Sequence, residues 1–161
     1  MIATNADPGK KTAEVAQGQF EQLGFKVKFR MVPQDTMYTR FCNVPSQNVA
    51  VCPNVGWFKD FADGQAMLDA TFNGDNILQQ GNVNYSELDV PAINEAAKAA
   101  SLLPVGKERN KAWAKINEMI IEQAPAIPYI WDKTALIGSK DMVVVPNGYT
   151  TVHDLSYTHF K

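Results

Sequence analysis

The sequence predicts an α/β fold in which helices flank a mixed sheet, because helical and strand periodicities alternate along the chain. Its 161 residues are 45% hydrophobic and 10% aromatic, which is enough to bury the core of one ordinary domain. A strand, a helix and a second strand follow one another at the start of the chain. That order at this length indicates a right-handed βαβ crossover.

The first helix is predicted over residues 8–23. Asp7 is a candidate N-cap, Pro8 suits the first helical position, and Gly24 supplies a left-handed residue after the last turn. Residues 2–4 look like the end of a strand. Residues 25–31 alternate apolar with basic side chains, which is typical of a strand with one buried face.

Later segments are assigned by the same patterns. We expect a short helix over 34–41, strands near 48–52 and 126–131, and two amphipathic helices over 89–102 and 107–123, the first of them capped by Asp89. The predicted inner faces carry Val90, Ile93, Ala97 and Ala100 on the first of these helices and Trp113, Ile116 and Ile120 on the second. We expect the helices to pack on the sheet. Residues 55–85 are rich in Asn, Asp and Gly and show little periodicity, and irregular chain of this length usually marks a functional surface.

The charge balance excludes some partners. Fifteen basic and seventeen acidic residues give a formal net charge of −2, so no strong positive field exists to hold nucleic acid. No apolar run approaches the roughly 18 residues that a membrane-spanning helix requires. The first seven residues lack the basic and apolar regions of a signal peptide.

Two cysteines, Cys42 and Cys52, close a short loop. We favour a disulfide over two buried free thiols, because a pair this close in sequence suits a loop staple. A bridge implies an oxidising compartment, and it fits a piece of a longer exported protein. With His153 and His159 the cysteines match a zinc inventory in number but not in spacing, so we expect no metal.

Catalytic motifs are weak. A hydrolase or thiol enzyme could use Cys42, or Asp60 with Asp63 as paired carboxylates, but no nucleophile, phosphate-loop or metalloprotease signature surrounds them. We therefore expect neither an enzyme nor a cofactor. A binding surface remains at 56–63, where aromatic rings stand beside two carboxylates that could attract an ammonium group. Residue types alone favour the alternative in which Trp57 is a core anchor and Asp60 is a helix cap or a solvated acid.

Five ordered stretches give the sequence a family resemblance. They are Gln19–Val27, Gly56–Asp63, Asn84–Asp89, Glu108–Ile121 and Ala124–Tyr129. Together they resemble the C-terminal lobe of family 5 extracellular solute-binding proteins, the peptide and oligopeptide receptors of ABC importers. Such receptors close two lobes over a ligand.

The resemblance implies a type II periplasmic-binding-protein-like lobe over residues 1–139 and a tail, 140–161, that returns towards an absent first lobe. It implies capture of a small peptide or other solute for import through a permease, in an extracellular or periplasmic lipoprotein anchored at the cell surface. A folded lobe with no activity of its own is the alternative. Because the packing partners of the tail lie in the absent first lobe, Met142–Val145 would expose an apolar edge, and the tail would be disordered or mediate a homodimer.

The site residues follow from the same resemblance. Asp60 occupies the place of the carboxylate that pairs with the α-amino group of a peptide ligand. Phe58 and Phe61 would wall the pocket, and Trp57 would wall it or support the loop. The sequence departs from the family pattern at Asp63-Gly64, where members often have Asp-Pro.

Overall fold

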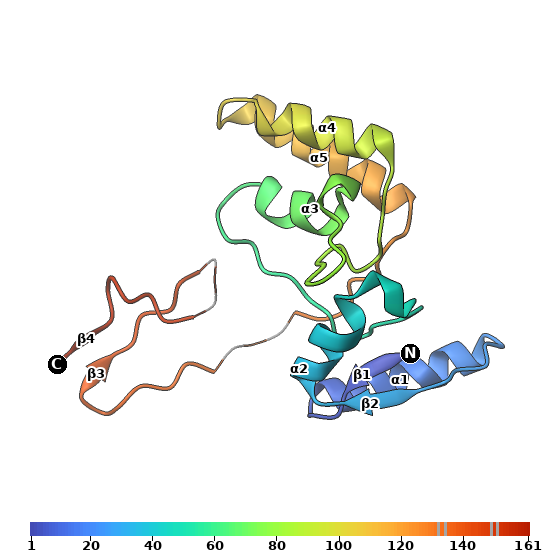
Figure 1. Ribbon diagram of the computed structural model, residues 1–161. Helices are drawn as coiled ribbons and strands as arrows, with labels where there is room; N and C mark the ends of the chain where they lie inside the picture. The colour runs from blue at the N-terminus through green and yellow to red at the C-terminus, as the bar shows by residue number, and fades with distance from the viewer. Residues whose placement is uncertain (132, 134, 149, 151) are drawn as a thin grey trace.

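The computed structural model describes residues 1–131, 133, 135–148, 150 and 152–161. It is a mixed α/β structure with two small hydrophobic cores. Figure 1 shows one body built on β1, β2, α1 and α2, a second body of α3, α4 and α5 above it, and a tail to one side that carries β3 and β4. The α/β class is confirmed, although the predicted single sheet is divided into two two-stranded sheets.

The first body begins with the expected βαβ crossover. Strand β1 (Ile2–Thr4) and strand β2 (Arg30–Val32) pair in parallel, with Ile2 opposite Arg30, and α1 (Gly9–Gln22) connects them. The strand predicted over 25–31 is therefore shorter than expected and begins only at Arg30. Because β1 offers only three residues to pair with, the ladder cannot extend back to the exposed Phe25.

The C-terminal end of α1 is as predicted, and its N-terminal end is not. Gly24 has a φ of +91° and donates to the carbonyl of Glu21, as expected of a residue after the last turn. The predicted N-cap at Asp7 is wrong: the helix begins after Pro8 with no side-chain cap. The Asp7 carboxylate instead lies 3.6 Å from the Nζ atom of Lys11 on the exposed surface.

Short helical turns follow β2, interrupted by the extended Val44. They are α2 (Gln34–Met37), a π-helical turn η1 (Tyr38–Cys42) and a 3₁₀ turn η2 (Pro45–Gln47), so the short helix predicted over 34–41 is confirmed. Met37 and Cys42 are buried beside Val32, and these three residues form the first core.

The strand predicted at 48–52 is wrong. One backbone hydrogen bond of 3.1 Å joins the N–H of Ile2 to the carbonyl of Val51, but residues 48–52 are not a strand in the structure. Asn48 has a left-handed backbone, with φ +48°, and Pro53 has no N–H to donate. A longer ladder with β1 therefore cannot form at either end of this segment.

The second body is helical. It contains α3 (Gln65–Phe72), α4 (Pro91–Ser101) and α5 (Lys107–Glu122), so the two longer predicted helices are confirmed within two residues at each end. The core residues lie on the predicted faces of α4 and α5: Ile93, Ala97, Ala100, Trp113, Ile116 and Ile120.

The packing of these helices differs from the expectation. Helices α4 and α5 pack on each other and on α3 rather than on a sheet, because the three-residue strands are too short to cover them. The predicted cap at Asp89 is also wrong. Val90 precedes the first turn, Pro91 occupies its first position, and the Asp89 carboxylate accepts a hydrogen bond of 2.8 Å from Asn94.

The segment between α3 and α4 contains one short helical element, the 3₁₀ turn η3 (Gly74–Asn76). Elsewhere in this segment, the side chains of buried asparagines bond the backbone. The Asn84 side chain is fully buried and bonds both the N–H and the carbonyl of Leu88, at 3.0 and 2.9 Å. The Asn82 side chain donates to the carbonyl of Asn84 at 2.7 Å. These amides satisfy backbone groups that a helix or strand would otherwise pair.

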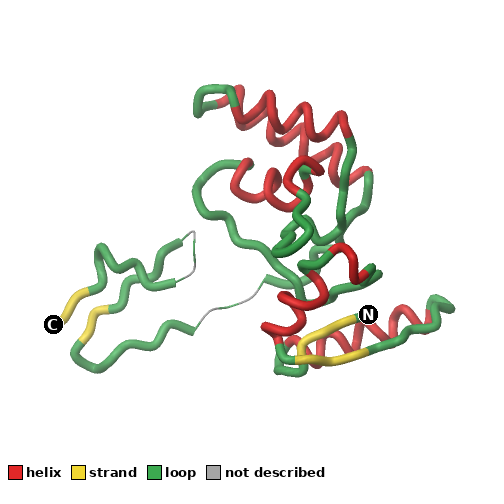
Figure 2. The backbone as a smooth tube through the Cα atoms, viewed as in Figure 1, coloured by secondary structure: helices red, strands yellow, loops and turns green. Residues whose placement is uncertain are grey.

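The chain after α5 first returns to the first body, where the Tyr129 hydroxyl donates a hydrogen bond to the carbonyl of Pro53, and then runs on to the tail. Residues 126–131 are extended but are not a strand, and Trp131 is 93% exposed, so the strand predicted there is wrong: among the described residues it has no neighbouring strand with which to pair. Beyond it, β3 (Met142–Val143) pairs antiparallel with β4 (His159–Phe160). Figure 2 shows these two strands at the end of a long loop. Met142–Val145, predicted as an exposed apolar edge, is half-buried and partly paired within the tail.

Candidate functional site

The loop Gly56–Asp63, which we call the ligand loop, connects the first body to α3. In Figure 1 it bows outwards beside α3. Phe58 and Phe61 are 56% and 50% exposed, and Asp60 between them is also exposed. The loop therefore presents two aromatic rings and one carboxylate to solvent.

Trp57 supports the base of the ligand loop. Its half-buried indole donates from Nε1 to the carbonyl of Ala66, in the first turn of α3, at 2.9 Å. This bond joins the beginning of the loop to the helix that follows it. The structure thus places Trp57 as a support for the loop, and its predicted contact with a ligand stays a prediction.

Asp63 ends the loop in a buried ion pair. Its Oδ2 atom accepts from Arg109 Nε at 2.6 Å and its Oδ1 atom from Arg109 Nη2 at 3.2 Å, and both side chains are at most 8% exposed. Oδ1 also accepts from the backbone N–H of Gln65 at 2.8 Å, which caps the start of α3. The hydrogen bond from Arg109 holds the pKa of the Asp63 carboxyl below its usual value.

The remaining Arg109 donors reach α3 and α4. Nη2 donates to the side-chain oxygen of Gln65 at 2.7 Å. Nη1 faces three carbonyls at the end of α4, those of Ala100, Ser101 and Leu103, at 3.2, 2.7 and 3.0 Å. One guanidinium on α5 therefore joins the ligand loop to both neighbouring helices.

Gly64 explains the departure from Asp-Pro in the family pattern. A Cβ atom at this position would lie 2.5 Å from the Cβ of Trp113, a distance that real contacts do not show. Trp113 is buried on α5, one turn after Arg109. A proline at position 64 would therefore displace α5 from the end of the loop.

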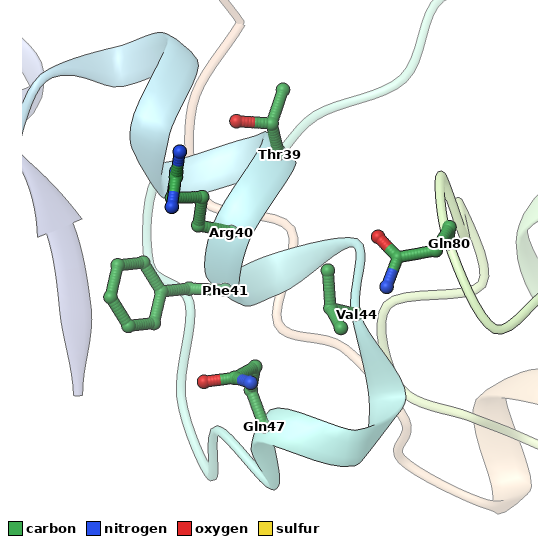
Figure 3. A pocket seen from close by; sticks show the side chains of 6 residues that line it. All are labelled: Thr39, Arg40, Phe41, Val44, Gln47 and Gln80. Atoms are coloured by element: carbon green, nitrogen blue, oxygen red, sulfur yellow. The ribbon is translucent and has the colours of Figure 1, made fainter.

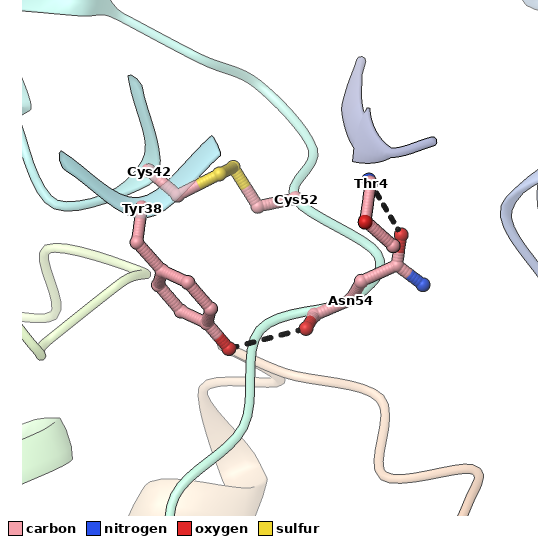
Figure 4. Close-up of a disulfide and its surroundings, with 5 residues drawn as sticks. All are labelled: Thr4, Tyr38, Cys42, Cys52 and Asn54. Carbon is pink, nitrogen blue, oxygen red and sulfur yellow. Dashed lines mark hydrogen bonds between the residues drawn. A yellow bond between two sulfur atoms is a disulfide. The ribbon is translucent and has the colours of Figure 1, made fainter. Parts of the chain in front are cut away.

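A disulfide closes the chain segment that precedes the loop. Cys42 and Cys52 are bonded, with their Cα atoms 6.2 Å apart, and this confirms the predicted bridge. Figure 4 shows the bridge beside Tyr38 and Asn54. The Tyr38 hydroxyl donates to the Asn54 carbonyl at 3.2 Å, and the Asn54 side chain accepts from the N–H of Thr4 at 3.2 Å.

Tyr85 reaches the first residue of the ligand loop from the asparagine-rich segment. Its hydroxyl donates to the Gly56 carbonyl at 3.4 Å, and its ring lies 6.2 Å from that of Tyr38. Burial, with a smaller contribution from Tyr38, raises the pKa of Tyr85 to about 12. Its hydroxyl therefore stays protonated and able to donate at neutral pH.

The structure separates the predicted site residues into two kinds. Phe58, Asp60 and Phe61 are exposed and stay predicted ligand residues, whereas Asp63 is paired with Arg109 and Cys42 is in the disulfide. Arg109 and Tyr85 are supports of the loop that the sequence did not predict. Each lies within a stretch that carried the family resemblance, but no local pattern pairs either of them with the loop.

A separate hollow of about 620 Å³ lies beside the π-helical turn. Figure 3 shows the six residues that line it: Thr39, Arg40, Phe41, Val44, Gln47 and Gln80. None of the four predicted ligand residues is among them. The ligand loop therefore does not line this hollow.

Metal ligands and membrane spans were also sought in the described part of the chain. It holds no cluster of three His, Cys, Asp or Glu side chains that could bind a metal ion. Its helices include none that is both long and apolar enough to cross a membrane.

Comparison with known proteins gives one structural match. No family model matches the sequence, and no curated protein matches it significantly. The fold is similar to that of a solved structure described as clavulanic acid biosynthesis oligopeptide binding protein 2, with a TM-score of 0.85 over 99% of this chain and 17% sequence identity. The chain spans 30% of the length of that protein. The match confirms the fold of a periplasmic-binding-protein-like lobe.

Proposed function

We propose that this chain is one lobe of a solute-binding receptor that captures a small peptide for import by an ABC transporter. The single observation that carries the proposal is the fold match over 99% of the chain to an oligopeptide-binding protein. The match covers 30% of that protein, as expected if a second lobe completes the site. A permease would be the partner of the complete receptor.

The exposed end of the ligand loop supports a ligand with a cationic group. Asp60 can pair with an ammonium group, and the rings of Phe58 and Phe61 offer apolar walls on either side. Closure of a second lobe would bury this pair, and a buried carboxylate without its partner is costly. The α-amino group of a peptide fits this requirement.

The disulfide supports an extracellular or periplasmic location, because such bonds persist in oxidising compartments. The disulfide of Cys42 and the ion pair of Asp63 with Arg109 support a binding role without catalysis. A thiol nucleophile would need Cys42 to be free, and a carboxylate pair would need Asp63 to be released from Arg109.

Calorimetry tests the proposal on a receptor that carries this lobe and its partner lobe. Trialanine should bind, and N-acetyltrialanine should bind at least tenfold more weakly because acetylation removes the positive charge. Asp60→Ala should abolish this difference, and Glu14→Ala, which removes an exposed acid on α1, should preserve it. Equal binding of both peptides would contradict the ammonium assignment. Binding of a sugar or metal complex alone would contradict the peptide assignment.

The 161-residue chain alone should bind the same peptides only weakly. An open half-site buries little of the ligand, and association costs roughly 4–15 kcal/mol of motional freedom. We expect a dissociation constant of roughly 1 mM, equivalent to about −4 kcal/mol. Micromolar binding by this chain would show that the site needs no second lobe.

A further inference from the structure

We propose that Arg109 is a positioning residue of the ligand site, which holds the ligand loop in the conformation that presents Asp60. The assignment of this loop as a ligand site rests on the proposed function. The effect of Arg109 on the loop rests on the contacts of this chain alone.

The loop depends on anchors at its two ends. At the start, the Trp57 indole donates to the Ala66 carbonyl, and at the end Asp63 is held by Arg109 and by the N–H of Gln65. The exposed residues between these anchors include Phe58, Asp60 and Phe61. Side chains on so exposed a segment keep a fixed direction only if its ends are fixed.

Both anchors lead to the first turn of α3. Asp63 caps that turn and Ala66 lies within it, so a change at Asp63 moves the acceptor of the Trp57 indole. Gln65, between them, accepts from Arg109 Nη2. Arg109 therefore acts on the far end of the loop through Asp63 and on the near end through the start of α3.

A lysine cannot replace this guanidinium. Arg109 uses Nε, Nη1 and Nη2 towards acceptors on three sides: the Asp63 carboxylate, the Gln65 side chain and the carbonyls at the end of α4. A lysine ammonium keeps the charge but has neither the planar fork nor the number of donors. Arg109→Lys should thus loosen the loop while the ionic attraction to Asp63 partly remains.

The contacts also couple the ligand loop to the connection between α4 and α5. Nη1 holds the carbonyls of Ser101 and Leu103, next to the exposed Leu102. One guanidinium thus bonds both Asp63, at the end of the ligand loop, and the connection between α4 and α5.

The test compares two indole N–H groups in the 161-residue chain by NMR hydrogen exchange. The Trp57 indole exchanges when its bond to Ala66 opens. Trp113 is 3% exposed in the core between the helices, so its indole N–H meets water and exchanges only when that core opens. The ratio of the two rates separates loop opening from general destabilisation.

We expect Arg109→Lys to raise the Trp57 rate at least tenfold relative to the Trp113 rate. Gln65→Met, which removes one Arg109 acceptor and leaves the ion pair, should raise the ratio about threefold and serves if Arg109→Lys fails to fold. Arg40→Lys, the same change at an exposed arginine on η1, should leave the ratio unchanged.

An unchanged ratio in the folded Arg109 and Gln65 variants would overturn the proposal and leave Arg109 as a purely structural residue. Failure of the proposed function would look different. A receptor that binds no peptide but shows the raised ratio would lose the ligand assignment and keep the positioning role.

Discussion

Asp60 and Asp63 stand three residues apart on the same loop, but their surroundings give them opposite roles. Asp60 is exposed, while Asp63 is buried against Arg109. Asp63→Asn should lower the free energy of unfolding by about 3–5 kcal/mol, because it leaves the Arg109 charge buried without its partner. Asp60→Asn should change it by less than about 0.5 kcal/mol. Urea unfolding of both variants measures the difference, and equal effects would contradict the ion pair.

The same pair makes stability depend on pH. The pKa of Asp63 is lowered in the folded protein by the hydrogen bond from Arg109, so the ionised form favours folding. This stabilisation is complete above the unfolded pKa of about 3.9 and is lost as the pH falls through the lower folded value. Between pH 6 and pH 3 the urea midpoint should fall more steeply for the wild type than for Asp63→Asn. Asp60→Asn should retain the wild-type slope.

Gly64 gives a steric test at the same scale. Gly64→Ala places a Cβ 2.5 Å from that of Trp113 and should cost about 1–3 kcal/mol through overpacking. Gly56→Ala is the matched control, because a Cβ there meets nothing within 4 Å. Thermal unfolding should therefore show a lower Tm for the first variant alone. A fully stable Gly64→Ala would show that α5 can withdraw from the loop at no cost.

At the scale of elements, periodicity predicted helices better than strands. The stripes on α4 and α5 gave the correct bounds and core faces, because a helix completes its hydrogen bonds within its own segment. The segments 48–52 and 126–131 are apolar enough for strands, but a strand also needs a neighbour. Helix α3 was missed because its buried residues, Ala66 and Thr71, are small and do not form an apolar stripe.

In the candidate site, too, features local in sequence could be predicted and contacts between distant residues could not. The ligand loop was singled out by the family resemblance of a stretch of aromatic and acidic residues that are adjacent in sequence. The Asp63–Arg109 pair joins residues 46 positions apart, and only the fold brings them together. Nothing in the local sequence distinguishes this buried carboxylate from the exposed one beside it.

The disulfide should contribute to the stability of the first body. Replacing both Cys42 and Cys52 by alanine should lower the free energy of unfolding by roughly 2–3 kcal/mol, since the bridge closes a ten-residue separation in the unfolded chain. A reductant should lower the wild type to the same level and leave the variant unaffected. Intact mass under non-reducing conditions should be two hydrogens below the reduced mass. Two thiols that alkylate in the native chain would contradict the bridge.

At the scale of the whole molecule, the tail is the least integrated part. The hydrogen bonds described for residues 140–161 join them to one another or to Ser139, and Leu155, Tyr157 and Phe160 are exposed. Apolar side chains beside a short open sheet favour pairing with a second chain. We expect the intact chain to dimerise on sedimentation at raised concentration and a chain ending at Ser139 to stay monomeric. Identical sedimentation and stability would show that the tail contributes to neither.

The buried asparagines also bear on how the protein ages. Asn73 precedes Gly74, and Asn-Gly is the dipeptide in which the next backbone nitrogen most readily attacks the side-chain amide and releases ammonia. Here the Gly74 nitrogen donates to Asn94 at 2.9 Å, and the Asn73 amide donates to Asp69 at 2.9 Å. The attacking nitrogen is thus turned away while the chain is folded. Conversion to aspartate would set two carboxylates side by side in a buried position, so damage that begins in the unfolded chain would oppose its refolding.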